Sequence, residues 1–300
     1  ARGARTAGGR IIEDCTVSAI HTKDGRVTGV STVEGDITAE IVVNCGGQRA
    51  REVGQKVGVN GPLISVQHQY MVTEAIEGLP RDMPTIRDPD RRIYFKEEVG
   101  GLVAGVYEPN PIPWANDGIP EGFNFQLLES NWDHFEPAIV QCMERVPMLE
   151  TAGIKELING PESFTPDGNF ILGESPEVEN FFVGAGFNAF GIASGGGAGK
   201  ALAEWIIAGE PAMDLGPVDI RRFGPHHGDI DWVRNRTLEL YGKHYTLPWP
   251  FEEHESCRPL KTSQLYERLA EQGACLGEKM GWERPNWFAP EGVEAKDEYS

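Results

Sequence analysis

The segment that most constrains the fold lies between residues 159 and 211, where glycines crowd the sequence between short apolar stretches and a helix. A turn at 165–168 is followed by two predicted strands, the second over 181–184, and then by an amphipathic helix that begins near Ala198. Dense glycine lets a backbone approach a flat or phosphorylated ligand closely, and a helix start presents unpaired N–H groups and a positive dipole end. The segment therefore predicts a ligand-binding crossover in an α/β domain.

Two nucleotide-binding motifs nearly match this segment. A P-loop requires a glycine five residues before Gly199 and Ser or Thr after Lys200, but the chain has Ser194 and Ala201 there, which excludes it. The relaxed dinucleotide fingerprint GxGxxG/A fits residues 184–189 after an apolar strand. A helix should begin inside that fingerprint, with an acidic residue about twenty residues later. Because further glycines extend the loop instead, a Rossmann first turn is disfavoured.

The first sixty residues predict a small meander followed by a buried strand. Apolar residues alternate between residues 10 and 44, and Asp24-Gly25 marks a tight turn, which is typical of antiparallel strands. Residues 41–44 form a continuous apolar run that ends in Cys45-Gly46-Gly47. This pattern is expected of a parallel strand that is buried on both faces and meets a ligand at its carboxyl end. Residues 48–57 then predict a helix.

Residues 62–161 predict strands backed by one helix, which is an α+β layer. The extended segments cover 65–73, 92–97 and 101–107. The helix covers 131–146, where apolar residues recur at helical spacing, and this apolar stripe is interpreted as core. After Asp214 the composition changes to many prolines and tryptophans, with one further helix predicted over 262–272.

Charge and composition exclude several classes of function. The net charge of -19 argues against nucleic-acid binding, which needs a basic surface. No apolar run approaches the ~18 residues of a membrane span, so no membrane partner is expected. The five cysteines are widely spaced and form no CxxC pair, which favours reduced thiols in a bacterial cytoplasm or a mitochondrial matrix. His226-His227 with Asp229 and Asp231 lacks zinc-like spacing, so a polar loop is favoured and no metal is expected.

Five motifs together carry a family resemblance. They are FTPDGNFILGESPEVENFFVGAGFNAFGIASGGGAGKALAEWIIAGEP, IVVNCGGQRAREVG, PLISVQHQYMVTE, RPLKTSQLYERL and GWERPNWF. In their order they resemble the D-amino-acid-oxidase-like FAD-dependent oxidoreductases, and more narrowly the dimethylglycine and sarcosine dehydrogenase branch. The resemblance implies FAD as cofactor and a fold of α/β and α+β parts. These parts are an incomplete FAD-binding domain, an antiparallel-sheet substrate domain, and a C-terminal linker that starts an aminomethyltransferase-type domain.

The resemblance also implies how the chain is divided. Residues 1–58 correspond to the end of the first FAD-domain segment, 59–160 to the substrate domain, 161–212 to the returning FAD-domain segment, and 213–300 to a linker and the beginning of a folate-type region. Family members open with a strand, a GxGxxG turn and a helix that hold the ADP half of FAD, and the first forty residues lack them. We therefore expect a fragment that binds FAD poorly and is inactive alone.

The residues implied to contact the flavin come from both FAD-domain segments. Their glycines let the backbone approach the flavin ring closely. The start of a helix that follows a glycine-rich segment places partial positive charge near the reduced, anionic flavin. An ordinary solvated helix position remains an open alternative for Lys200. The predicted cofactor-binding residues are Gly46, Gly47, Gly186, Phe187, Gly191, Ile192, Gly195, Gly196 and Lys200.

An amine-oxidising flavoenzyme needs a base or proton acceptor. His68 lies two residues from Tyr70, and therefore on the same face of a predicted strand. Spacing alone fits a core histidine, and the resemblance favours a catalytic one. Tyr94 is the predicted catalytic partner of His68.

The same chemistry needs an aromatic pocket and an anchor for a carboxylate. Tyr70 and Tyr107 are predicted to bind substrate, with sheet packing as the open alternative for Tyr107. Arg92 is the predicted anchor because a guanidinium pairs bidentately with a carboxylate, and Arg87 and Arg49 remain alternatives.

The function implied by the resemblance is FAD-dependent oxidation of the N-methyl group of a small amino acid of the dimethylglycine or sarcosine type. The expected partners are that substrate and an electron acceptor, either a flavoprotein or oxygen. Tetrahydrofolate is expected only in a full-length protein. The alternative is a non-catalytic regulatory subunit of the pyruvate dehydrogenase phosphatase regulatory type, which shares the architecture.

Overall fold

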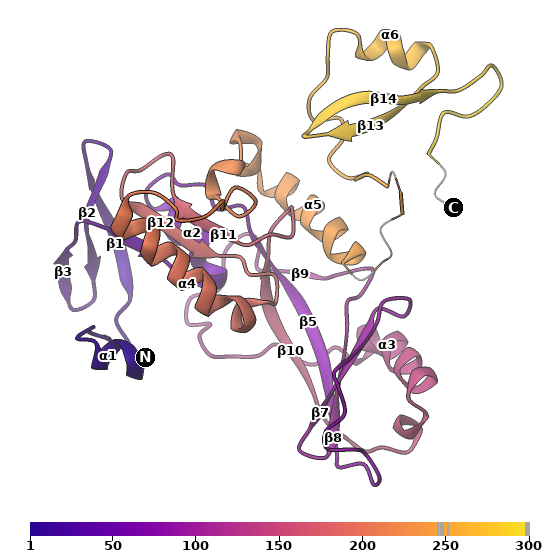
Figure 1. Ribbon diagram of the computed structural model, residues 1–300, viewed down its shortest axis with the longest axis horizontal. Helices are drawn as coiled ribbons and strands as arrows, with labels where there is room; N and C mark the ends of the chain where they lie inside the picture. Colours follow the sequence, from indigo (N-terminus) through magenta and orange to yellow (C-terminus); the bar gives the residue numbers. More distant parts are fainter. Residues whose placement is uncertain (245, 247–248, 251, 298–300) are drawn as a thin grey trace. The chain divides into compact units, whose positions relative to one another are not determined.

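The computed structural model describes residues 1–297 except 245, 247, 248 and 251, and it folds into two compact units (Figure 1). The first unit comprises Ala1–Leu63 and Asn169–Gly228. The second comprises Ile64–Gly168 and Asp229–Ser300. Each unit is thus built from two stretches that are distant in sequence. No helix in the described part of the chain is long and apolar enough to cross a membrane.

The first unit contains two three-stranded sheets. One is an antiparallel meander of β1 (Val17–Lys23), β2 (Arg26–Thr32) and β3 (Gly35–Thr38). The other has the order β11-β12-β4, in which β4 (Val42–Asn44) runs parallel to β12 (Phe181–Ala185), and β11 (Ile171–Glu174) is antiparallel to β12. The helical elements of this unit are α1 (Arg2–Thr6), η1 (Gly47–Arg49), α2 (Ala50–Gln55), α4 (Gly191–Ala208), η3 (Ile220–Arg222) and η4 (Pro225–Gly228).

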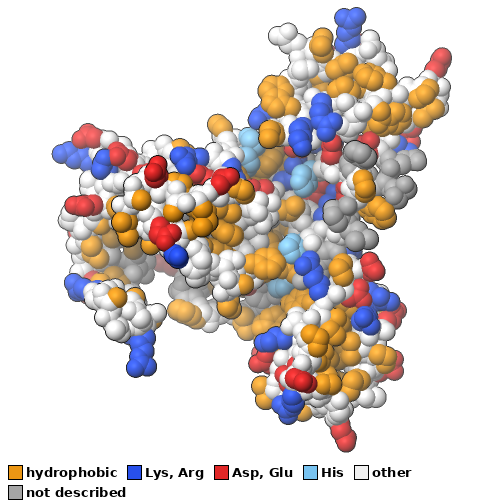
Figure 2. Space-filling model, in the orientation of Figure 1, with side chains coloured by type: hydrophobic (Ala, Val, Ile, Leu, Met, Phe, Trp, Pro, Cys, Tyr) orange, Lys and Arg blue, Asp and Glu red, His pale blue; other side chains and the backbone are white. Residues whose placement is uncertain are grey.

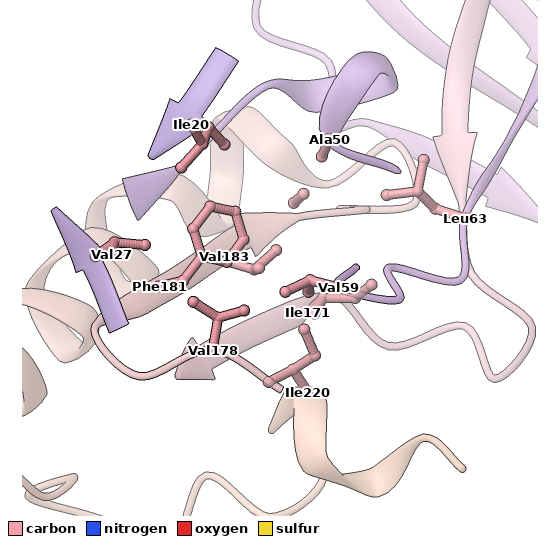
Figure 3. Packing of buried hydrophobic residues seen from close by; sticks show 11 residues of the cluster. Ile20, Val27, Ala50, Val59, Leu63, Ile171, Val178, Phe181, Val183 and Ile220 are labelled. Carbon is pink, nitrogen blue, oxygen red and sulfur yellow. The ribbon is translucent and has the colours of Figure 1, made fainter. Parts of the chain in front are cut away.

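An apolar core joins the meander to the mixed sheet. Ile20 and Val27 point from β1 and β2 toward Phe181 and Val183 on β12 (Figure 3). The β1–β2 turn uses Asp24 and Gly25 with φ of 51° and 78°, the conformation that an Asp-Gly hairpin turn requires. The predicted meander and the predicted parallel strand are therefore confirmed. Burial of that strand on both faces is not, because Val43 is exposed.

The second unit is organised around an antiparallel sheet of order β10-β5-β8-β7-β6, with β9 paired to β5. The elements of this unit are β5 (Ile64–Thr73), β6 (Ile86–Asp88), β7 (Ile93–Glu98), β8 (Gly101–Val106), β9 (Pro113–Trp114), α3 (Trp132–Arg145), η2 (Pro147–Glu150), β10 (Ile154–Phe164), α5 (Ile230–Lys243), α6 (Tyr266–Glu271), β13 (Ala274–Lys279) and β14 (Trp282–Phe288). The last two strands form a separate hairpin. The three predicted strands and the helix over 131–146 are confirmed.

The two faces of the large sheet have different coverings. On one face, Met71, Phe95 and Ala104 pack against Phe135 and other apolar residues of α3, which lies beside β7 and β8 (Figure 1). The opposite face carries His68 and Tyr70, because successive strand residues alternate between faces. We call this opposite face the histidine face. Ile64 and Val66 on the histidine face pack against Val233 and Tyr241 of α5.

Several elements differ from the expectations of the sequence. The helix expected near Ala198 begins at Gly191, so the glycines at 195–197 lie inside α4 and not in a loop. Burial of Ala198, Leu202 and Trp205 anchors this helix and overrides the low helix propensity of glycine. The helix expected over 262–272 is limited to α6. The sequence analysis did not predict β10, α5 or the β13–β14 hairpin.

Candidate functional site

His68 lies in a buried hydrogen-bonded triad with Tyr241 and Glu108. Its Nδ1 is 2.8 Å from the Tyr241 hydroxyl, and that hydroxyl donates to Oε2 of Glu108 at 2.7 Å. His68 comes from β5, Glu108 follows the end of β8, and Tyr241 is brought in by α5. The whole triad belongs to the second unit and joins residues that are far apart in sequence. We refer to these three residues as the triad.

The triad is held in unusual protonation states by burial. Burial lowers the pKa of His68 to about 4, and the charge of nearby His244 lowers it further in the same direction. Burial raises the pKa of Glu108 to about 7, although the hydrogen bond from Tyr241 acts in the opposite direction. Burial and the neighbouring Glu108 raise the pKa of Tyr241, so it remains a phenol. His68 is therefore neutral near pH 7, and Glu108 is poised between its two forms.

Aromatic rings surround His68 on the histidine face. The Tyr107 ring centroid lies 4.9 Å from that of His68 and 5.2 Å from that of Tyr241. His244 stacks on Tyr107 with centroids 4.4 Å apart, and Phe164 meets Tyr241 edge to face at 4.8 Å. Such a setting disfavours charge on a bound amine by desolvation, while the π-faces accept a residual cation.

Tyr94 lies on the histidine face, two strands away from His68 in the sheet. The strand β8 lies between β5 and β7, and in this register Tyr70 and Tyr94 both pair with Gly105. The Tyr94 ring crosses Gly105, where a Cβ would overlap the ring. One strand thus separates the two residues, and Nδ1 of His68 is hydrogen-bonded to Tyr241 from α5, so the catalytic partnership of His68 with Tyr94 stays a prediction.

The three arginine candidates lie in different surroundings. Arg87 pairs with Tyr94 across β6 and β7 and so shares the histidine face, and its charge lowers the pKa of His244. Arg92 instead lines a cavity of about 390 Å³ together with Glu108 and residues of α3. Arg49 belongs to the first unit and lies 3.2 Å from Glu52. The structure therefore places Arg87, and not Arg92, on the same face as His68.

The predicted cofactor-binding glycines gather at one edge of the mixed sheet in the first unit. The strands β4 and β12 are parallel, so their carboxyl ends, which lead into Gly46 and Gly186, meet at the same edge. A Cβ at Gly46 would lie 3.1 Å from Oδ1 of Asn44, a tight contact that a larger residue could make only if the Asn44 side chain shifted. Gly47 and Gly186 have φ of 56° and 68°, which favours glycine. Such an edge is where ligands bind in open α/β sheets.

The loop that follows β12 leads into an uncapped helix start. Phe187 stacks on Phe170 with centroids 4.9 Å apart, and no side chain caps α4 at Phe190. The first N–H groups of α4, from Gly191 and Ile192 onward, are therefore directed toward this edge.

The exposed side of α4 is lined by small residues. A Cβ at Gly195, Gly196, Gly197 or Gly199 would meet no other atom within 4 Å. Ile192 and Phe190 are exposed at the start of the helix. Figure 2 shows hydrophobic side chains gathered over this region of the first unit. This open, glycine-lined side and the uncapped helix start fit a flat ligand that carries negative charge.

Lys200 differs from the rest of the predicted cofactor set. It lies in the middle of α4, about two turns after the helix start, with its Nζ 3.6 Å from Glu204. Its side chain is 76% exposed. Because the helix begins earlier than expected, Lys200 does not lie at the helix start. The described residues also contain no group of three or more His, Cys, Asp or Glu that could hold a metal ion.

Four residues of the site were not predicted from the sequence: Glu108, Tyr241, His134 and His244. Glu108 had a usable signal, because it is a carboxylate placed directly after an apolar strand that is buried along its length. Tyr241 had none, because the helix that carries it was not predicted. His134 lies on α3, with its Nε2 4.0 Å from Oε1 of Glu108.

We expect Glu108→Gln to change how stability depends on pH. The pKa of Glu108 rises from 4.5 to about 7 on folding, so the folded state keeps a proton that the unfolded state releases. Stability is therefore lost as pH rises from about 4.5 to 7, and glutamine removes this loss. The free energy of unfolding of Glu108→Gln minus that of the parent should be about 2 kcal/mol larger at pH 8 than at pH 5, so the variant is relatively more stable at pH 8. Urea denaturation at both pH values measures it, and an equal difference at the two pH values would contradict the assignment.

Two family models match successive stretches of the chain. Residues 1–205 match a family model described as FAD dependent oxidoreductase, and residues 208–263 match one described as FAD dependent oxidoreductase central domain. The chain is 43% identical over 307 residues to human mitochondrial sarcosine dehydrogenase, and the alignment covers 100% of this chain and 33% of that protein. It is 41% identical over 293 residues to the mouse mitochondrial pyruvate dehydrogenase phosphatase regulatory subunit, and this alignment covers 97% of this chain and 33% of that protein.

A solved structure shares the fold. The crystal structure of glycine oxidase from Geobacillus kaustophilus aligns with a TM-score of 0.60 and 25% identity, over 74% of this chain and 55% of that chain. The chain spans about a third of the length of the curated relatives named above. FAD is the cofactor of the matching family. From the family match over residues 1–205 and the relatives that cover the whole chain, we conclude that this protein belongs to the family of FAD-dependent oxidoreductases.

Proposed function

We propose that the chain is part of an enzyme that oxidises the N-methyl group of a small amino acid, of the sarcosine or dimethylglycine type. The observation that carries this proposal is the histidine face, where a neutral buried imidazole lies among tyrosine rings with an arginine on the same face. The 43% identity to human sarcosine dehydrogenase supports it. These groups answer the needs of an amine substrate that carries a carboxylate.

The residues of the first unit would hold FAD. Gly46, Gly47 and Gly186 let the backbone approach the ring closely, and the start of α4 places N–H dipoles toward negative charge. The open glycines of α4 leave room for close packing. When bound, FAD supplies the acceptor for a hydride from the N-methyl carbon.

The residues of the second unit would bind and deprotonate the substrate. A secondary or tertiary amine is mostly protonated at pH 7, and its nitrogen lone pair must be available before a hydride leaves the methyl carbon. His68 is neutral near pH 7, so a ring nitrogen is available to accept that proton, and desolvation among the aromatic rings lowers the pKa of the bound amine as well. Tyr70 and Tyr107 line the histidine face around the amine, and Arg87 is the better placed anchor for the carboxylate.

The partners of the full-length protein follow from the same proposal. The electrons leave to a flavoprotein or to oxygen, and tetrahydrofolate accepts the one-carbon unit only where a folate domain is present. A mitochondrial matrix or a bacterial cytoplasm suits this chemistry and the widely spaced thiols.

A second candidate is a non-catalytic regulatory role. The specific observation in its favour is the 41% identity to the mouse pyruvate dehydrogenase phosphatase regulatory subunit over 97% of this chain. The triad argues for the enzyme, because burying an ionisable carboxyl beside a histidine costs stability that a purely structural core does not need.

Anaerobic reduction of the flavin separates the two candidates. The natural full-length protein that contains this chain, loaded with FAD, should lose its flavin absorbance on addition of sarcosine or dimethylglycine. Betaine is the matched control, because its quaternary nitrogen has no lone pair and it should leave the flavin oxidised. Bleaching by neither amine, in a protein that retains FAD and is reduced by dithionite, would favour the regulatory role.

A further inference from the structure

The triad connects the two faces of the large sheet. His68 lies on the histidine face, whereas Glu108 lines the cavity of about 390 Å³ on the side of α3, together with Pro137 and Ala138. Tyr241 bridges them at the end of β8. A polar path therefore runs from the candidate base to a cavity on the opposite face of the sheet.

Only one of the two carboxyl oxygens of Glu108 is hydrogen-bonded within the triad. Its Oε2 accepts from Tyr241, but its Oε1 is buried and has no hydrogen-bond partner among the described residues. The side chain is 6% exposed, and the nearest basic group is Nε2 of His134 at 4.0 Å. A buried carboxyl oxygen without a partner is costly, and it faces a cavity through which it can exchange a proton with solvent.

We propose that Glu108 is a positioning residue that sets, through the Tyr241 hydroxyl, which nitrogen of His68 carries the proton. As a carboxylate, Glu108 accepts from the Tyr241 hydroxyl, so Tyr241 accepts from Nδ1–H of His68 and Nε2 keeps its lone pair. As a carboxylic acid, Glu108 donates to Tyr241, which then donates to Nδ1 and leaves the proton on Nε2. A hydroxyl has one hydrogen to donate, so both bonds of the triad reverse together.

The tautomer of His68 should respond to pH through Glu108. The pKa of His68 is about 4, so the ring is neutral from pH 5.5 to 8.5 and only its tautomer can change in that interval. The pKa of Glu108 is about 7, inside the interval. The tautomer with a lone pair on Nε2 should therefore appear as pH rises through the pKa of Glu108, not that of His68.

Other titratable or charged groups face the triad. Those around His68 and Tyr241 are Tyr94, Tyr107 and His244, with Arg87 acting on His244. Those around Glu108 are Asp90, Arg91, Arg92 and His134. Burial lowers the pKa of His134 and of His244, so both remain neutral over the upper part of the interval.

Nitrogen NMR of the histidine rings tests the inference on the 300-residue chain without flavin. With ¹⁵N-labelled histidine, the signals of His68 are assigned by their loss in His68→Gln. The parent should carry its proton on Nδ1 at pH 8.5 and mainly on Nε2 at pH 5.5. In Glu108→Gln and in Tyr241→Phe the tautomer should be the same at both pH values. The second variant keeps the test valid if the first does not fold.

Glu162→Gln is the matched control. Desolvation also raises the pKa of Glu162, but its side chain is exposed on β10 and lies outside the triad, so this variant should keep the tautomer change of the parent. The inference is overturned if the parent shows one tautomer throughout, if His68 becomes an imidazolium between pH 8.5 and 5.5, or if the change persists in Glu108→Gln or is lost in Glu162→Gln.

Only the use of Nε2 as the base rests on the proposed function, so the two can fail separately. A tautomer change without any oxidation of N-methyl amines would overturn the proposed function alone. Oxidation without a tautomer change would overturn the inference about Glu108 alone. Where both hold, the kcat/KM of the full-length enzyme should rise with pH through the pKa of Glu108, and Glu108→Gln should remove that step.

Discussion

Replacing His68 with glutamine is expected to slow amine oxidation by the full-length flavoprotein by about 10²- to 10⁴-fold, the usual contribution of a general base. Glutamine has nearly the same length and can still hydrogen-bond the Tyr241 hydroxyl, so the triad stays filled. It cannot accept a proton near pH 7, and this is the property that the variant removes. The rate of anaerobic flavin reduction at saturating sarcosine measures the effect.

The control for this variant is His21→Gln. His21 is exposed on β1 in the first unit and hydrogen-bonds Ser31 at 2.8 Å, so its loss should leave the rate unchanged. FAD content must be equal in all three proteins, because the prediction concerns the chemical step. A rate within threefold of the parent in His68→Gln would remove His68 from the role of base.

Replacing Gly196 with leucine is expected to abolish retention of FAD in the full-length protein without destabilising this chain. In the chain itself a Cβ at this position meets no atom within 4 Å. Leucine also has a higher helix propensity than glycine by about 0.8 kcal/mol, so the helix α4 should become more stable. If the glycine-lined side of α4 must admit the cofactor closely, the side chain blocks it.

Two measurements on the same substitution test this second prediction. The urea midpoint of the 300-residue chain should stay equal or rise, and the FAD content of the purified full-length variant should fall at least about tenfold, which corresponds to about 1.4 kcal/mol. Ala208→Leu in the last turn of α4 is the control, and it should retain FAD. Stoichiometric FAD in Gly196→Leu would show that the flavin does not approach this side of the helix.

Local patterns in the sequence were enough to predict part of the fold. The Asp24-Gly25 turn, the alternation over 65–73 and the apolar spacing over 131–146 each encode one element through nearest neighbours, and each element is present. By contrast, β10 carries Gly160 and Pro161 together with three charged residues. Its pairing with β5 along its whole length is what makes it a strand, and that information is not local.

In the helix α4, tertiary packing likewise overrides the local preference of the sequence. Glycine is a poor helix former, so the sequence between Gly191 and Gly197 predicts a loop. Packing of Leu202 and Trp205 against the mixed sheet holds the helix and extends it backward through the glycines. This extension places Lys200 in the middle of the helix. It also creates an exposed side of α4 that carries glycines in place of larger side chains, which the sequence did not reveal.

The candidate site was only partly predictable for a similar reason. His68 and Tyr70 share a face because of strand periodicity, which can be read from the sequence, whereas Tyr107 joins them through the register of β5 and β8. The hydrogen-bond partner of His68 is 173 residues away on a helix that the sequence did not reveal. Side chains that meet across such separations are fixed by topology, and topology follows from strand order.

The central claim is that the N-methyl carbon is the one oxidised, and isotope substitution tests it most directly. The glycine oxidase neighbour shares the fold, so the architecture alone does not choose between the N-methyl carbon and the carbon that bears the carboxylate. Anaerobic flavin reduction of the full-length protein should be several-fold slower with N-trideuteromethyl sarcosine than with unlabelled sarcosine, and unchanged with sarcosine deuterated at C2. A slow reaction with the C2-deuterated substrate, and a normal rate with the N-trideuteromethyl one, would contradict the account.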